Sequence, residues 1–70
     1  MSINDLQTDI VYTDKQGRFR KIIDFYDGID GERRARYEAG WIRSYDGQWH
    51  KFETRDCSKK SFARWAKEKL

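Results

Sequence analysis

The residues most able to do chemistry in this chain are one histidine, one cysteine and a few closely spaced aspartates. His50 would act as a general base only with a nucleophile or an orienting carboxylate within hydrogen-bond reach. The predicted hairpin places Arg43 opposite it instead. Cys57 lies among basic residues, which lower a thiol pKa, but no base is placed to activate it. We therefore interpret His50 as a surface strand residue and Cys57 as a half-buried structural thiol.

The aspartates and glycines are better explained by turns than by catalysis. Asp24, Asp27 and Asp30 are close enough in sequence to suggest a carboxylate pair or a metal site. The segment 27–31, however, lacks the length and spacing of a calcium loop, and aspartate is a favoured turn residue. The glycines match no phosphate-binding or dinucleotide-binding pattern, and one histidine with one cysteine cannot complete a usual structural zinc site. We predict no enzymatic activity, no cofactor and no metal.

The length of 70 residues allows one domain with a small core. Stability must come from packing of the three Trp, four Tyr and four Phe or from association with another chain. A single cysteine excludes an internal disulfide and, with no apolar signal segment at the N-terminus, predicts a reducing, cytoplasmic setting. No run approaches the roughly 18 apolar residues of a membrane span, so we expect no membrane partner.

The charge is unevenly distributed along the chain, although its formal sum is only +3. Residues 1–54 contain nine basic and ten acidic residues, whereas residues 55–70 contain six basic and two acidic ones. The positive charge therefore gathers at the C-terminal end, where it creates a local positive field.

The spacing of the turn signals predicts an α+β fold, a four-stranded antiparallel β-meander packed on a C-terminal amphipathic helix. Residues 1–8 are predicted to be a flexible leader and residues 9–70 a single small domain. Within that domain, Asp/Gly-containing turns at 14–17, 27–31 and 46–47 separate segments rich in β-branched and aromatic residues, which is typical of a meander.

A two-residue turn at Asp46-Gly47 would set Trp41 opposite Phe52. Loops at 27–31 and 14–17 would set Asp24 opposite Arg34 and Tyr12 opposite Phe19. This register separates ion pairs from apolar pairs. The predicted core face consists of Ile10, Tyr12, Phe19, Ile23, Phe25, Tyr37, Ala39, Trp41 and Phe52.

Two segments decide the remaining architecture. Residues 32–39 contain good helix formers but also alternate in strand fashion up to Trp41, so that strand and short helix both stay open. The last segment is predicted to be helical, with Ser58 or Ser61 as its N-cap. Its apolar side would carry Phe62, Trp65, Ala66 and Leu70, and its cations would point away.

The opposite face of the predicted sheet is the main candidate site. Solvated strands do not need isoleucine, tyrosine, tryptophan and arginine together, and such residues often dominate binding energy. An alternative is that the leader or a second copy of the chain covers this face, as in a homodimer. The candidate partner-binding residues are Arg20, Ile22, Tyr26, Arg34, Arg36, Ile42, Trp49 and Lys51, with Val11 beside them.

These features favour a non-catalytic module that binds and modulates or inhibits a larger protein, because mixed charge suits a protein surface. In size and build the chain resembles the accessory and inhibitor proteins of phages and mobile elements. No motif assigns it to a family.

The alternative is a small basic nucleic-acid-binding protein. It would use the sheet aromatics and the helix cations Lys59, Lys60, Arg64 and Lys67. A three-stranded sheet followed by a helix, with Gly40-Trp41 and Asp46-Gly47-Gln48-Trp49, is similar to the arm-binding domains of phage integrases. The basic strand residues that those domains use are here interleaved with Asp24, Glu38 and Glu53.

Overall fold

The computed structural model describes residues 1–70 as a five-stranded antiparallel sheet with one α-helix and one 3-10 helix. The order of strands across the sheet is β4-β3-β2-β1-β5. The elements are η1 (Ile3–Asp5), β1 (Val11–Thr13), β2 (Phe19–Asp27), β3 (Arg33–Ile42), β4 (Trp49–Ser58), α1 (Lys59–Trp65) and β5 (Glu68–Lys69). The predicted α+β class is confirmed. The sheet has five strands rather than the predicted four, because β5 pairs with β1 at the edge of the β1–β4 meander. The segment 32–39 lies in β3 rather than in a helix.

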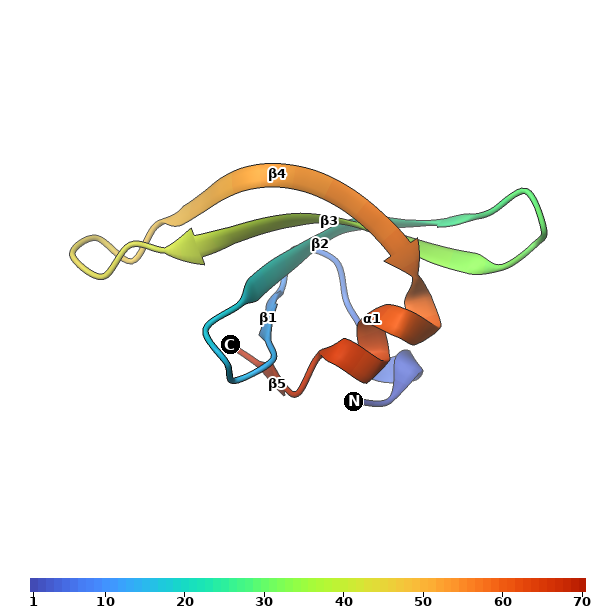
Figure 1. Cartoon of the computed structure of the whole chain (residues 1–70), viewed down its shortest axis with the longest axis horizontal. Coiled ribbons are helices and arrows are strands. Elements are labelled where there is room, and N and C mark those ends of the chain that lie inside the picture. Colours follow the sequence, from blue (N-terminus) through green and yellow to red (C-terminus); the bar gives the residue numbers. More distant parts are fainter.

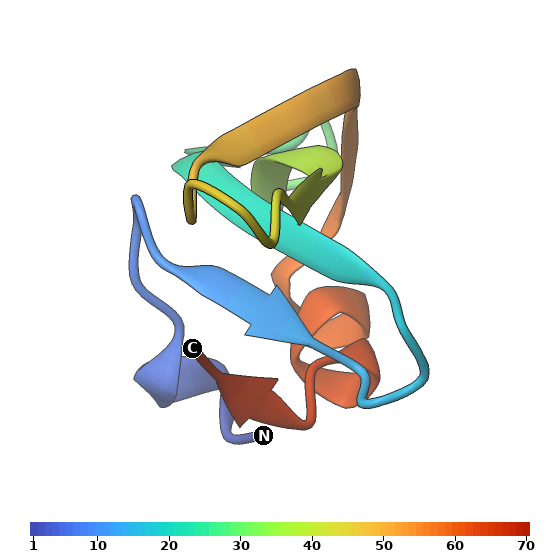
Figure 2. The ribbon, with the colours of Figure 1, turned by 90° about the vertical axis from the view of Figure 1, so that its left-hand side faces the viewer.

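The three long strands β2, β3 and β4 form a curved ribbon, and the other elements lie on its concave side (Figure 1). The molecule measures 42 × 21 × 17 Å along its principal axes, because the β2–β3 and β3–β4 hairpins project beyond this lower layer at opposite ends (Figure 1). The view along the long axis shows β1 and β5 side by side below the ribbon, next to α1 (Figure 2). The β3–β4 projection (residues 40–52) is called the arm.

Two bulges set the register of the long strands. The pairing of β2 with β3 shifts between Ile22 and Asp24, and the pairing of β3 with β4 shifts between Ala39 and Gly40. Each shift places one extra residue on a strand that flanks β3. The extra residue is Ile23 on β2 and Phe52 on β4, and an extra residue bends a strand and increases its twist. The bulges account for the curvature of the ribbon.

The registers predicted from the sequence are therefore wrong in detail. Trp41 pairs with His50 rather than with Phe52, and Tyr12 pairs with Arg20 rather than with Phe19. Arg36, and not Arg34, pairs with Asp24. The connection between β3 and β4 is longer than the predicted two-residue turn, since Arg43 and Gln48 still share a backbone hydrogen bond.

The core lies between the concave side of the ribbon and the helices. Tyr12, Ile22 and Phe62 are completely buried, and the Phe62 ring meets the Tyr12 and Tyr37 rings edge to face. The remaining buried apolar residues are Leu6, Ala35, Tyr37, Ala63 and Ala66.

Part of the predicted core face is exposed. Because Ile23 is the bulge residue of β2, Ile22 takes the buried position and Ile23 faces solvent. Trp41 and Phe52 are 45% and 63% exposed.

The N-terminal segment, predicted to be a flexible leader, lies against α1 and is part of the folded domain. Leu6 is buried in the core, and the Gln7 backbone N–H donates a hydrogen bond to the Tyr12 hydroxyl at 2.8 Å. At the other end, Ser58 caps α1 as predicted, because its Oγ accepts a hydrogen bond from the Ser61 N–H at 3.0 Å. The helix ends at Trp65, so that Leu70 follows β5 and is exposed instead of lying on the helix.

Candidate functional site

The convex face of the ribbon carries a network of charged side chains that satisfy one another. Asp56 accepts hydrogen bonds from the Tyr26 hydroxyl and from Arg34 Nε, the latter at 3.3 Å. Arg36 pairs with Asp24 at 3.4 Å and lies over the Tyr26 ring. The Tyr26 hydroxyl and the Arg34 guanidinium lower the pKa of Asp56 below its ordinary value. The cations of this network therefore already have anionic partners.

A second cluster on the convex face lies on the arm. The Trp49 indole N–H donates to Glu38 Oε1 at 2.9 Å, and Lys51 Nζ lies 3.7 Å from Glu38 Oε2. Ile42 pairs with Trp49 across the strands and is 36% exposed. Glu38 thus interacts with the polar groups of both Trp49 and Lys51.

The structure divides the predicted partner-binding residues between two faces. Tyr26, Arg34, Arg36, Ile42, Trp49 and Lys51 share the convex face, as the alternation in β2, β3 and β4 requires. Ile22 and Arg20 lie on the concave face, because they pair with Tyr37 and Ala39. Ile22 is completely buried and cannot touch a partner. The predicted single patch is therefore not continuous.

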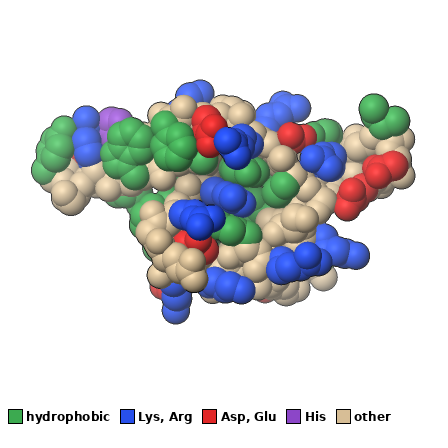
Figure 3. Space-filling model, viewed as in Figure 1, with side chains coloured by type: hydrophobic (Ala, Val, Ile, Leu, Met, Phe, Trp, Pro, Cys, Tyr) green, Lys and Arg blue, Asp and Glu red, His purple; other side chains and the backbone are tan.

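The concave face of the arm carries an exposed aromatic stack, of which Trp41 and Phe52 were predicted to lie in the core and His50 at the surface. The Trp41 ring lies between the His50 and Phe52 rings, with centroid distances of 5.8 and 5.9 Å and an interplanar angle of 23° in both pairs. These three residues are called the aromatic patch. In Figure 3, hydrophobic side chains gather beside the histidine at the arm end of the molecule.

The length of α1 explains why the aromatic patch is uncovered. A helix of seven residues spans about 10 Å, whereas a strand of ten residues spans about 33 Å. The helix covers the concave face near Ala35 and Tyr37 and ends before it reaches Trp41. The signal was present in the sequence, since the polar run Lys67-Glu68-Lys69 stops the apolar pattern after Ala66.

The backbone of the arm is built to hold the patch. A Cβ at Gly40 would lie 2.1 Å from the His50 carbonyl oxygen, so only glycine permits the close approach of β4 at this bulge. The bulge residue Phe52 then reaches the same face as His50 and stacks on Trp41. At the tip, Arg43 pairs with Asp46 and lies over the Tyr45 ring, and Tyr45 is 78% exposed.

The cations of the α1 region form a separate surface. Lys60, Arg64 and Lys67 are exposed and pair with no carboxylate, although Lys67 Nζ donates to the Arg64 carbonyl at 3.3 Å. Lys59, predicted to point away from the core, lies over the Phe25 ring at 4.5 Å. Of the predicted nucleic-acid-binding residues, Lys59, Lys60 and Arg64 therefore lie on α1 and Lys67 on the link to β5, and three of the four are exposed.

The residues considered for catalysis, His50 and Cys57, both lie on β4. His50 stacks on Trp41, and its Nε2 atom has no hydrogen-bond partner. Burial raises the pKa of the Cys57 thiol above its ordinary value, which makes it a poor nucleophile at neutral pH. No group of three or more His, Cys, Asp or Glu side chains is placed to hold a metal ion.

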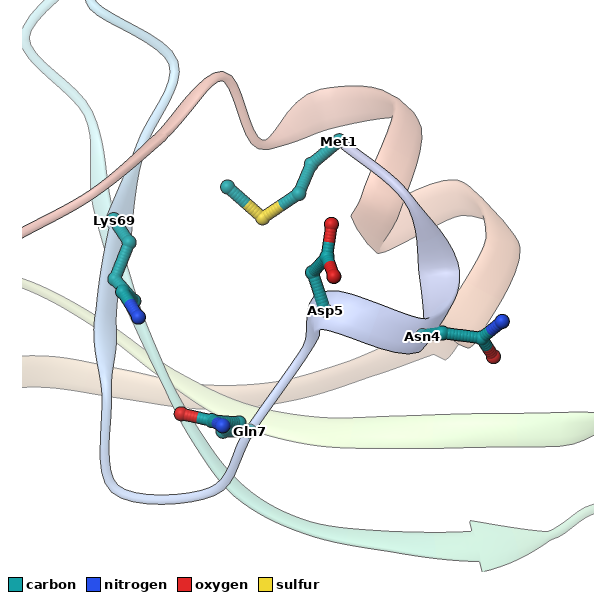
Figure 4. Close-up of a pocket in the computed structure, with 5 residues that line it drawn as sticks. All are labelled: Met1, Asn4, Asp5, Gln7 and Lys69. Carbon is teal, nitrogen blue, oxygen red and sulfur yellow. The ribbon is translucent and has the colours of Figure 1, made fainter.

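A pocket lies at the N-terminal end of the chain. It has a volume of about 330 Å³ and is lined by Met1, Asn4, Asp5, Gln7 and Lys69 (Figure 4). One carboxylate and one ammonium group line it, with no nucleophile between them. No helix of the structure has the length and apolar character needed to cross a membrane.

Comparisons with protein-family models, curated proteins and solved structures find no match to this chain.

Proposed function

We propose that this protein is a non-catalytic binding module whose aromatic patch docks on a larger protein and modulates or inhibits it. The observation that carries the proposal is the exposed stack of Trp41 between His50 and Phe52 on the concave side of the arm. Aromatic side chains supply large contact areas at small cost in conformational entropy, and exposed apolar patches often mark interfaces.

The charges around the patch favour a protein over a polyanion. Near it, Arg18, Arg43 and Arg55 pair with Asp14, Asp46 and Glu53, respectively. A phosphate backbone binds through several unpaired cations, whereas a protein surface can match both signs. The single cysteine supports a reducing cytoplasmic setting for this interaction.

The proposal is tested by capture of host proteins on the immobilised chain. In the double variant Trp41→Ala/Phe52→Ala, we expect the amount of captured partner to fall by about tenfold or more, because interface aromatics often contribute 2 kcal/mol or more. Far-UV circular dichroism should stay unchanged, since both side chains are exposed.

The matched control is Ile42→Ala/Trp49→Ala, which removes apolar area from the convex face of the same arm. It should retain capture. Loss of capture in the control alone would place the contact on the convex face, and equal capture by both variants would contradict the proposal.

Nucleic acid is the second candidate, favoured by the unpaired cations Lys60, Arg64 and Lys67. Tryptophan fluorescence titrations with single-stranded and duplex DNA and RNA at two salt concentrations distinguish the two functions. Binding that weakens steeply with salt and disappears on reversal of these three charges would establish nucleic-acid recognition. Absence of binding at low salt would exclude nucleic-acid binding as the function.

A further inference from the structure

A second feature of the concave face is a pocket directly beside the aromatic patch. It has a volume of about 270 Å³ and lies between the segment that leads into β2 and strand β4. Its main side chains are Arg18, Phe19, Arg20, Phe52, Glu53 and Arg55. Three guanidinium groups against one carboxylate make the lining positive, and Phe52 belongs both to the pocket and to the aromatic patch.

Arg20 is the exceptional cation of this pocket. Six of the eight arginines of the chain lie within 4.0 Å of a carboxylate, and the two others are Arg20 and Arg64. Arg64 is exposed on α1, but Arg20 is half-buried. A half-buried guanidinium with no anionic partner has lost part of its hydration without gaining an ion pair.

Aromatic rings hold the Arg20 guanidinium in place. Its Cζ atom lies 4.7 Å from the centroid of the Tyr37 ring and 4.2 Å from that of the Trp65 ring. These contacts stabilise the cation through the ring faces. The faces of the two rings accept no ordinary hydrogen bond, whereas the guanidinium has five N–H donors in its plane. None of the side-chain hydrogen bonds in the structure involves Arg20, so its donors stay available to a ligand.

The surrounding charges select the kind of anion. Arg18 is already paired with Asp14 at 3.6 Å and Arg55 with Glu53 at 3.0 Å. One uncompensated cation therefore remains, which matches a single carboxylate better than a multiply charged phosphate. Arginine binds carboxylates with two parallel hydrogen bonds, and Phe52 offers an apolar side chain to the carbon atoms next to such a group.

We infer that this pocket binds the carboxylate of an acidic side chain on the protein partner, with Arg20 as the anion-binding residue. The inference rests on the proposed function, because it specifies the chemistry of the partner that docks on the neighbouring aromatic patch. The partner segment would carry an aspartate or glutamate next to an apolar residue that contacts Phe52.

The probe for this inference is the blocked dipeptide N-acetyl-glutamyl-phenylalanine amide, compared with its glutaminyl analogue. Arginine Nε–H signals are followed by NMR in the full chain. We expect the Arg20 signal to shift saturably with the acidic dipeptide, at about tenfold lower concentration than with the neutral one, because hydrogen bonds between charged groups are the stronger ones.

Two variants identify the residue responsible. Because the Arg20 variants lack the Arg20 Nε–H signal, binding to all variants is followed by the backbone amide signals of the pocket residues Gly17, Ala39 and Gly40. Arg20→Gln should abolish the difference between the acidic and neutral dipeptides, whereas Arg18→Gln, which removes a neighbouring but paired guanidinium, should retain it. If Arg20→Gln alters the fold, Arg20→Lys keeps the charge and removes the planar donor set. It should bind the acidic dipeptide with intermediate strength.

Three results would overturn the inference. These are equal binding of the two dipeptides, no saturable shift of the Arg20 signal, or tighter binding of inorganic phosphate or uridine monophosphate than of the acidic dipeptide. The proposed function fails separately, since it is lost if Trp41→Ala/Phe52→Ala leaves partner capture unchanged. If that double variant no longer captures the partner but Arg20→Gln still does, the result supports the aromatic patch as the docking surface and contradicts the carboxylate site.

Discussion

The convex and concave faces of the ribbon use the same residue types in opposite ways. On the convex face, Tyr26, Arg34 and Asp56 are bound to one another, and Trp49 donates to Glu38. On the concave face of the arm, Trp41 and Phe52 stack in the open. The aromatic and arginine content that suggested a binding surface is thus present on both faces, but only the concave face leaves it unsatisfied.

The difference teaches that composition alone does not identify a binding surface. An ion pair between exposed groups contributes little to stability, yet it removes its members from contact with a partner unless the pair is broken. An exposed aromatic stack can contact a partner without the loss of an existing ion pair or hydrogen bond. A binding site on a small sheet is therefore better sought where side chains lack partners than where aromatic and charged residues are most numerous.

The largest expected effect separates the buried concave position on β2 from the exposed bulge next to it. Ile22→Ala should lower the free energy of unfolding by about 2–5 kcal/mol, because it leaves a cavity in a completely buried site. Ile23→Ala is the matched control and should cost only about 0.5 kcal/mol at an exposed position. Urea denaturation measures both. Equal losses would mean that the bulge between Ile22 and Asp24 is misplaced.

A medium effect is expected where the arm holds the aromatic patch. Gly40→Ala should destabilise the protein by about 1–3 kcal/mol, since the added methyl group meets the His50 carbonyl oxygen at 2.1 Å. Displacing β4 would also separate Phe52 from Trp41, so the near-UV circular dichroism of the aromatics should change. Gly47→Ala, with open space around its Cβ but a φ of 68°, should lower stability without that spectral change. A Gly40→Ala variant of native stability would contradict this account of the bulge.

The smallest effect is expected on the convex face. The folded-state pKa of Asp56 is below its ordinary value of 3.8, because the Tyr26 hydroxyl and Arg34 bind the charged form. The stability that this carboxylate contributes is therefore complete above its ordinary pKa and is lost as the pH falls through the folded-state pKa. Asp56→Asn should unfold with a slightly shallower dependence on pH below about pH 4. This variant should also still capture the partner. A loss of capture would indicate that the convex face contributes to binding.

The sequence was sufficient to predict the order of β1 to β4 and α1, but not η1 or β5. Turn residues at Asp14–Gly17, Asp27–Gly31 and Asp46-Gly47 mark the hairpins, and Ser58 was identified as a helix cap. These are local signals, read from adjacent residues. The alternation from Ala35 to Trp41 correctly favoured a strand over a helix.

The face assignments failed because they depend on bulges and on distant parts of the chain. One extra residue at Ile23 exchanges the faces of all residues on one side of it, and no turn signal reports it. Trp41 was placed in the core because its alternation matches that of Tyr37, whereas its exposure depends on where α1 ends. Leu6 reaches the core through tertiary packing that a short polar segment does not reveal.

The Phe52 bulge also affects the open edge of the sheet. Strand β4 has no neighbour on its outer side, and an unpaired strand of ten residues is a template on which other chains can aggregate. The extra residue shifts the backbone hydrogen-bonding pattern of β4 between Lys51 and Glu53. A regular incoming strand can therefore form backbone hydrogen bonds with β4 on one side of the bulge but not in the same register on the other. The same residue that helps to build the aromatic patch thus also interrupts the regular edge of the sheet, which is one way in which native proteins limit edge-to-edge pairing.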